Sequence, residues 1–94
     1  MLIRIVRMEF DPEKVKNFLE LFEVVKGTII KCQGCLHLEL CKDAKLDNVY
    51  YTFSKWESED DLNNYRHSDF FEDTWTKTKA LFRGKPLAYS LMTG

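Results

Sequence analysis

The chain has 94 residues, which predicts a single domain over 1–94, and its 45% hydrophobic and 31% charged content is typical of a soluble globular protein. The 14 lysines and arginines and the 15 aspartates and glutamates leave a net charge of -1, which argues against a nucleic-acid-binding surface and against a polybasic membrane anchor, since both need a basic face. No apolar run approaches the ~20 residues that span a bilayer, and residues 1–7 lack the apolar core of a signal peptide, so the expected location is the cytoplasm.

The first predicted elements are a strand and a long helix. Residues 2–10, LIRIVRMEF, are rich in strand-forming residues. Asp11 and Pro12 mark a helix start, because an aspartate can accept the first free N–H groups and a proline fits the first helical turn. The helix is expected to end near 30–31, before Gly34. Its apolar residues at helical spacing are Val15, Phe18, Leu19, Phe22 and Ile29.

A β-hairpin is predicted next. Residues 35–42, CLHLELCK, alternate strictly, so one face of this strand is expected to carry Leu36, Leu38 and Leu40. The opposite face is expected to carry Cys35, His37, Glu39 and Cys41. The turn-rich segment 43–48 connects this strand to a second strand, 49–56, with the sequence VYYTFSKW.

Two short helices and a last strand complete the prediction. Ser58 and Ser68 precede acidic residues in the pattern of helix N-caps, and Gly84 is expected to end the second helix. The last strand covers 86–92, with Pro86 at its start. The order β-α-β-β-α-β, with the second helical region divided in two, predicts a ferredoxin-like α+β fold. In this fold a four-stranded antiparallel sheet carries its helices on one face.

The predicted sheet is apolar on both faces, although helices cover only one of them. The strands 2–10, 49–56 and 86–92 each carry apolar side chains at both odd and even positions. Monomers rarely expose a sheet face of this kind, and a domain of 94 residues buries comparatively little surface alone. The sequence therefore predicts a homodimer in which a second copy covers the free face.

The segment 50–75 carries a pattern that resembles a known family. An aromatic strand ends in Trp56-Glu57-Ser58 and leads through Tyr65-Arg66-His67 to Ser68-Asp69-Phe70-Phe71, after a Gly34-Cys35 pair that opens the preceding strand. In this order and spacing the chain resembles the antibiotic biosynthesis monooxygenase family of dimeric α+β barrels. The resemblance implies the fold and the dimer. It implies less about chemistry, because the family ranges from cofactor-independent oxidation of phenols and quinols to haem degradation.

The chain departs from two branches of that family. The haem-degrading branch uses an Asn, a Trp and a His iron ligand at places that here hold Arg7 or Met8, Tyr65 and Trp75, so haem degradation is set aside. Other branches often carry His at the places of Tyr65 and Phe70, which here are aromatic without an imidazole. Since the chain also lacks a flavin or nicotinamide fingerprint, no cofactor is expected.

Tyr65 and Trp75 are the first candidates for a site. They are expected to face the sheet among Leu62, Phe71 and Thr78, where they either line an aromatic pocket or form ordinary core. In a pocket, the Tyr65 hydroxyl could orient a phenol or a hydroquinone. In a core, the same hydroxyl needs only one polar partner.

The 2 histidines are candidate bases. His67, at the junction of the two short helices, could take a phenolic proton, or it could bond the last carbonyls of its helix. His37 is expected on the dimer-facing side of its strand with Glu39. There the two form either a base with its orienting carboxylate or a polar patch in the interface.

The 3 cysteines are expected to be free thiols, in keeping with a reducing compartment. Cys32-Gln33-Gly34-Cys35 is a C-x-x-C motif, but it closes a helix, where the dipole disfavours a thiolate, and this argues against a redox centre. Cys41 and His37 lie on the strand that leaves this turn, which leaves a zinc site incomplete. No metal is therefore expected.

Two functions stay open from the sequence. In the first, the protein is a cofactor-independent monooxygenase of a small phenol or hydroquinone. Its catalytic candidates are Tyr65, His67 and His37, and its substrate-binding candidates are Trp75, Phe71, Leu62, Arg7 and Arg4. In the second, it is a non-catalytic module of the same fold that binds a small aromatic or apolar metabolite.

Overall fold

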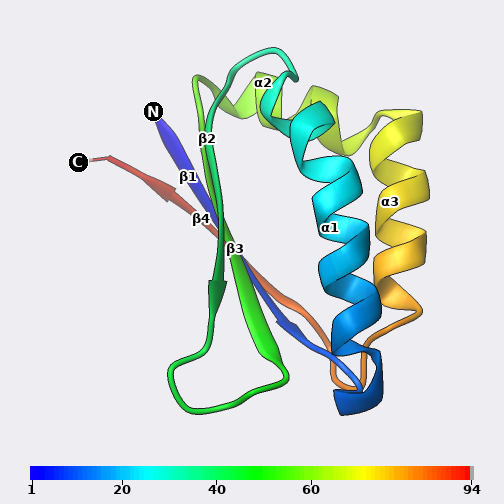
Figure 1. The fold of residues 1–94 in the computed structure, drawn as a ribbon. Helices are drawn as coiled ribbons and strands as arrows, with labels where there is room; N and C mark the ends of the chain where they lie inside the picture. Colours follow the sequence, from blue (N-terminus) through cyan, green and yellow to red (C-terminus); the bar gives the residue numbers. More distant parts are fainter. Residues whose placement is uncertain (94) are drawn as a thin grey trace.

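The computed structural model describes residues 1–93 as an antiparallel four-stranded sheet with helices on one face (Figure 1). The elements are β1 (Leu2–Glu9), the 3-10 turn η1 (Pro12–Lys14), α1 (Val15–Ile30), β2 (Cys35–Lys42), β3 (Val49–Trp56), α2 (Glu59–Arg66), α3 (Asp69–Lys79) and β4 (Leu87–Met92). The strands lie in the order β2-β3-β1-β4, which confirms the predicted ferredoxin-like fold. Within the described residues, no helix combines the length and apolar character needed to cross a membrane.

Side-chain caps set the starts of the short helices, as the sequence predicts. The Oγ atoms of Ser58 and Ser68 each accept a backbone N–H from three residues ahead, both at 3.1 Å. Asp11 also acts as a cap, but the turn that it caps, Pro12–Lys14, is 3-10, so the α-helix begins only at Val15. The local cap signals thus determine where α2 and α3 begin.

The alternation predicted for β2 is wrong at its start. A β-bulge between Cys35 and His37 shifts the pairing with β3 and leaves Leu36 as the extra residue. The Leu36 side chain is 54% exposed and does not pack on the core with the two later leucines of this strand. Cys35 packs instead against the buried cluster around Trp56. The pairing with β3 therefore decides which side chain faces inward here.

The predicted end of α3 is also wrong. The helix ends at Lys79, well before Gly84. The backbone then turns, and Phe82 pairs with Phe10, the residue after β1, as an isolated β-bridge. This pairing ends the helix before the glycine is reached. β4 begins directly after Pro86.

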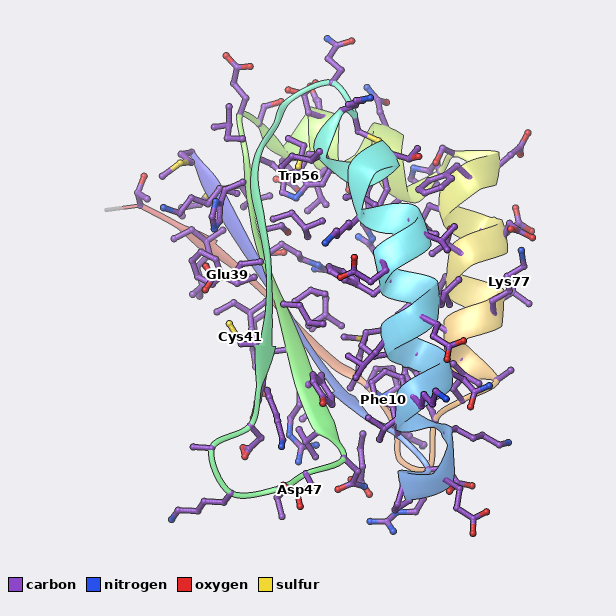
Figure 2. All side chains as sticks on the ribbon, viewed as in Figure 1. Phe10, Glu39, Cys41, Asp47, Trp56 and Lys77 are labelled. Atoms are coloured by element: carbon purple, nitrogen blue, oxygen red, sulfur yellow. The ribbon has the colours of Figure 1, made fainter. Side chains whose placement is uncertain are left out.

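Two buried clusters fill the layer between the sheet and the helices. The larger consists of Met8, Phe10, Phe18, Phe22 and Tyr50. The smaller consists of Leu2, Trp56 and Leu62. Figure 2 shows Phe10 and Trp56 in this layer toward opposite ends of the molecule, and Glu39 and Cys41 on the other side of the sheet. The helices therefore cover one face only.

The free face of the sheet carries an apolar surface over β4, β1 and β3, as the sequence predicts. Its β4 residues are about half exposed: Leu87 (47%), Tyr89 (51%) and Leu91 (48%). In the sheet pairing they lie opposite Arg7, Ile5 and Ile3 of β1, and the last two continue the apolar surface. Phe53 of β3 pairs with Ile5 on its other side and extends the surface across the sheet.

Candidate functional site

A cavity of about 310 Å³ lies between the sheet and the helices. Its walls include members of both buried clusters, such as Met8 and Phe18 from one and Trp56 and Leu62 from the other. The cavity therefore separates two packed regions of the core. Most of its lining side chains are apolar, and a space of this size and character suits one small organic molecule.

A chain of aromatic rings forms one wall of the cavity. The ring of Tyr65 stacks on that of Trp56 with centroids 5.1 Å apart, and meets Phe71 edge-on at 5.0 Å. Phe71 in turn stacks on Trp75, with centroids 6.0 Å apart and planes at 14°. All four rings line the cavity, and they also pack against one another. The aromatic residues therefore belong both to the core and to the cavity wall.

Tyr65 contributes an uncharged phenol side chain to this wall. Burial raises the pKa of its phenol, and the nearby thiols of Cys32 and Cys35 add to the rise. The side chain is therefore protonated at any physiological pH. It can donate a hydrogen bond to a ligand oxygen, but it cannot act as a base in its resting state.

Two arginines bring positive charge to the cavity. Arg4 reaches it from β1 and Arg66 from the last residue of α2. The Nη1 atom of Arg4 donates to Ser90 Oγ at 2.9 Å. Burial lowers the pKa of Arg4, and the charge of Arg66 lowers it further. Arg4 is a predicted site residue, whereas Arg66 was missed, although it directly follows Tyr65 in the sequence.

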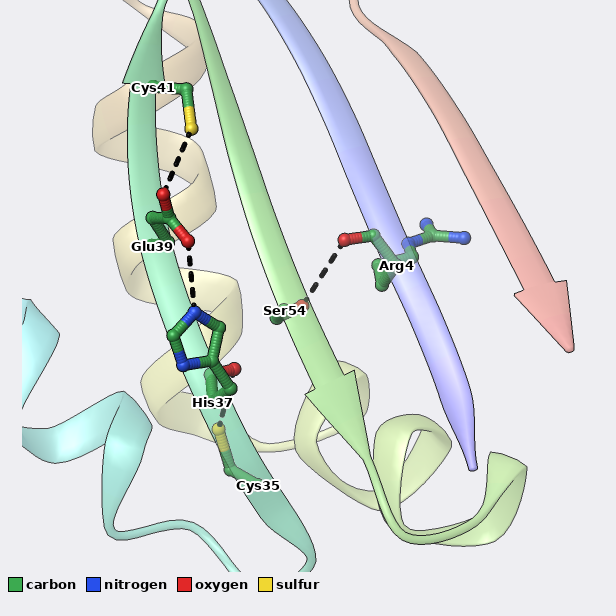
Figure 3. Close-up of polar contacts among 6 residues, drawn as sticks. All are labelled: Arg4, Cys35, His37, Glu39, Cys41 and Ser54. Atoms are coloured by element: carbon green, nitrogen blue, oxygen red, sulfur yellow. Dashed lines mark hydrogen bonds and ion pairs between the residues drawn. The ribbon is translucent and has the colours of Figure 1, made fainter. Parts of the chain in front are cut away.

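Two hydroxyl groups of the cavity wall, those of Ser54 and Thr78, are already engaged. Ser54 accepts from the indole Nε1 of Trp56 at 3.0 Å. It also donates to the carbonyl of Arg4 at 3.5 Å (Figure 3). Thr78 donates to the carbonyl of Thr74 at 2.8 Å. The other polar side chains that line the cavity are those of Arg4, Thr52, Tyr65, Arg66 and Thr74.

His67 lies outside the cavity. It caps the C-terminal end of α2, with its Nδ1 atom 2.8 Å from the carbonyl oxygen of Asn63. Its exposed ring borders a neighbouring hollow, which Arg66, Glu72 and Lys79 also line. This geometry matches the second of the two roles considered for His67, that of a side chain bonded to a carbonyl at the end of its helix.

His37 and Arg7 lie on the free face of the sheet, away from the cavity. The Nε2 atom of His37 is 3.0 Å from Glu39 Oε1, and Cys41 Sγ donates to Glu39 Oε2 at 3.6 Å, so the three side chains form a row along β2 (Figure 3). The hydrogen bond with His37 is the largest cause that lowers the pKa of Glu39, and the hydrogen bond from Cys41 lowers it further. Arg7 belongs to the same face, since it pairs with Leu87 of β4.

The C-x-x-C motif lies in the turn between α1 and β2. Burial raises the pKa of the Cys32 and Cys35 thiols, which opposes the thiolate that redox chemistry needs. Gly34 has φ of 82°, and a side chain at this position would collide with the carboxylate of Asp61. In residues 1–93 all three cysteines are free, and no three His, Cys, Asp or Glu side chains lie together as metal ligands.

The structure thus gathers part of the predicted site. Five of the predicted residues line the cavity: Tyr65, Trp75, Phe71, Leu62 and Arg4. Three predicted residues do not line it: His67, His37 and Arg7.

These features define a ferredoxin-like α+β domain with a ligand-sized aromatic cavity beneath its helices. The model of one family, antibiotic biosynthesis monooxygenase, matches residues 1–77, and the chain belongs to this family. The match covers every element except the end of α3 and the strand β4.

Solved structures of low sequence identity share the fold. A conserved protein of Methanosarcina mazei Go1 matches with a TM-score of 0.93 at 19% identity, over 100% of this chain and 94% of that one. A structure described as an antibiotic biosynthesis monooxygenase matches with a TM-score of 0.92 at 18% identity, over 100% and 99%. A Caulobacter crescentus CB15 protein, provisionally given the same description, matches with a TM-score of 0.89 at 20% identity, over 96% and 86%.

A curated protein of Halobacterium salinarum is similar over part of its length. It is provisionally named a heme-binding protein, and it is 30% identical over 66 residues, which are 70% of this chain. The match spans only 13% of the Halobacterium protein.

Proposed function

We propose that this protein is a cofactor-independent monooxygenase that oxidises a small phenol or hydroquinone in the cavity. The observation that carries the proposal is the aromatic cavity of about 310 Å³, with Tyr65, Phe71 and Trp75 in its wall, in a member of the antibiotic biosynthesis monooxygenase family. Its volume is at the lower end of the range for small-molecule sites, which favours a substrate of one or two rings.

The proposed reaction needs no external reductant. A phenol with a free ring position reacts with O2 to give a quinone and water. One oxygen atom bonds to the ring carbon, and the other leaves as water with the ring hydrogen and the hydroxyl hydrogen. The phenol supplies all four electrons that reduce O2. The reactive form is the phenolate, because the anion gives up an electron more readily than the neutral phenol.

The ionisable side chains of the cavity wall suit an anionic substrate. They are Arg4, Arg66 and Tyr65, with no histidine or carboxylate among them. The two cations stabilise a phenolate by direct attraction, and the neutral Tyr65 hydroxyl donates to its oxygen. The apolar walls exclude water and strengthen these interactions. In this scheme the phenol gives its proton to bulk water as it enters the cavity, and the cations favour this step because they lower the pKa of the phenol.

The proposal is tested by oxygen uptake with a panel of phenols and hydroquinones, with quinone formation followed by absorbance. We expect one O2 consumed for each quinone formed by at least one panel member. Boiled protein and the folded Arg4→Gln variant serve as controls. Uptake at the uncatalysed rate across the whole panel, with folded protein, would contradict the monooxygenase proposal.

A non-catalytic binding module is the second candidate. It is favoured by one observation: among residues 1–93, no imidazole and no side-chain carboxylate lines the cavity, so these residues offer no histidine or carboxylate as a base. In that case aromatic ligands raise the melting temperature without oxygen uptake. A panel screened in parallel by thermal shift and oxygen electrode separates the two functions.

Haem does not fit the residues of the cavity. The usual axial ligands are His, Cys, Met and Tyr, and here the wall offers only Met8 and Tyr65. Met8 is packed in the core at 2% exposure, and the raised pKa of Tyr65 disfavours the tyrosinate that binds iron. We therefore propose that this cavity does not bind haem. We expect that haemin mixed with the protein shows no new absorption band.

We further propose that the protein is a homodimer of the cytoplasm. The half-exposed leucines of β4 and the apolar residues beside them form a surface that a second copy can cover by two-fold symmetry. The free thiols of Cys32, Cys35 and Cys41 suit a reducing compartment. Light scattering at micromolar concentration tests the dimer, and a monomer would contradict it.

A further inference from the structure

We propose that the ligand of the cavity is an aromatic or apolar molecule with one negatively charged acidic group, and that Arg4 and Arg66 hold this group. The inference rests on the proposed function only in taking the cavity as the ligand site. It adds a substrate class, an organic acid, and a residue pair that recognises it.

The two arginines meet at the cavity from different parts of the fold. Arg4 is in the centre of the sheet, and Arg66 ends α2, yet both line the same space. Within residues 1–93 neither forms an ion pair with a carboxylate. Other cations of the chain do so, such as Arg83 with Glu9 at 3.1 Å and Lys77 with Asp73 at 3.0 Å. The cavity therefore collects two positive charges and no negative one.

The two like charges repel one another when no anion is bound. The side chain of Arg4 is partly buried, that of Arg66 is exposed, and the charge of Arg66 adds to burial in lowering the pKa of Arg4. The one polar side-chain contact of Arg4 is with Ser90, which is neutral. A carboxylate or phenolate between the two guanidinium groups would replace repulsion by attraction. The planar, multiply donating guanidinium is well suited to hold such a group in a fixed orientation.

The other side chains of the cavity wall favour an apolar character for the uncharged part of the ligand. Most of the remaining wall is formed by aromatic and aliphatic side chains, among them Phe71, Trp75 and Val6. Of the neutral polar side chains in the wall, Thr78 has its hydroxyl bonded to a helix carbonyl. Negative charge is therefore favoured beside the two arginines. A single negative charge also suits these walls better than a phosphate dianion, since each additional charge adds a desolvation cost.

The test compares a matched pair of probes, 2-naphthoate and its uncharged analogue 2-naphthamide. Both are titrated into the full-length protein at pH 7 by calorimetry. We expect the acid to bind about tenfold more tightly than the amide. Arg4→Gln and Arg66→Gln should each remove most of this difference while the affinity for the amide stays within about twofold. Arg4→Lys, which keeps the charge, should restore part of it.

Lys79→Gln is the matched control, because Lys79 borders the neighbouring hollow but does not line the cavity. It should keep the preference for the acid. Equal binding of acid and amide to the wild type, no binding of either at millimolar concentration, or an equal loss with Lys79→Gln would overturn the inference. Tighter binding of 2-naphthyl phosphate would reassign the arginines to phosphate esters and overturn it too. Failure of oxygen uptake leaves the ratio of acid to amide binding unaffected, so the proposed reaction and this inference fail separately.

Discussion

The ring of Tyr65 stacks on the ring of Trp56, with centroids 5.1 Å apart and planes at 23°. Trp56 is only 1% exposed, and its indole nitrogen is bonded to Ser54, so it is a fixed support. Tyr65 thus has one ring face on the core and also lines the cavity. A donor held in this way needs little reorganisation to meet a ligand oxygen, which is the property expected of a group that acts in a reaction.

Replacing Tyr65 with Phe should lower turnover with little effect on stability. The change removes one hydroxyl and leaves the stacking on Trp56 intact, so the free energy of unfolding should change by about 1 kcal/mol or less. Oxygen uptake and urea unfolding of the same preparations measure the two effects. Tyr89→Phe, on the free face of the sheet, is the control and should keep full turnover. Unchanged turnover in Tyr65→Phe would remove this hydroxyl from the mechanism.

Tyr65 should also make the protein less stable at alkaline pH. Its pKa in the fold is raised by burial, whereas an unfolded tyrosine ionises near pH ~10. The folded state therefore holds a proton that the unfolded state releases. The stability contributed by the neutral phenol is complete below pH ~10 and falls as the pH rises above it, by up to about 1 kcal/mol per pH unit.

Urea unfolding between pH 9 and 11 measures this loss, with Tyr65→Phe as the control. The raised pKa values of Cys32 and Cys35 act in the same direction in both proteins. The wild type should lose stability more steeply than the variant. Parallel curves would show that Tyr65 ionises at its ordinary pKa and is not buried as described.

The 2 tryptophans of the cavity wall should differ in their contribution to stability. Trp56 is almost fully buried, so Trp56→Ala should cost about 3–5 kcal/mol. Trp75 is only partly buried and borders the cavity, so Trp75→Ala should cost less, about 1–2 kcal/mol. Urea unfolding of the two variants makes the comparison. Equal costs would mean that the space beside Trp75 is packed core.

The two histidines should not be required as bases. His67 is bonded to a helix carbonyl, and His37 is on the opposite face of the sheet from the cavity. We expect His67→Gln and His37→Gln to keep their turnover and its pH dependence, measured by oxygen uptake. A variant that loses activity while its melting temperature is unchanged would identify its histidine as the base and revise the proposed proton transfer to water.

Leu91→Asp should break the proposed dimer. Leu91 lies on the free face of the sheet at 48% exposure, and a buried, unpaired carboxylate there would be costly. Light scattering should show monomer or aggregate. Val24→Asp is the control, since Val24 is 78% exposed on α1, away from that face. If Leu91→Asp stays dimeric, the copies associate through another surface.

The elements of this protein were largely predictable because their signals are local. Alternation and turn residues predicted 35–42 and 49–56, the bounds that β2 and β3 have. The serine caps act through hydrogen bonds to backbone groups three residues away, so Ser58 and Ser68 could be identified from neighbouring residues alone. Helical spacing likewise placed Tyr65 in the layer between helices and sheet.

What the sequence could not determine depends on contacts between distant segments. The bulge at Leu36 follows from pairing with β3, and the early end of α3 follows from the bridge that Phe82 makes to Phe10. The candidate site shows the same division. The sequence by itself determined the aromatic helix face that bears Tyr65. Only the tertiary structure decided that Arg4 and Arg66, more than half the chain apart, share one cavity while His37 lies behind the sheet, because the strand order and the pleat set which side chains meet across the core.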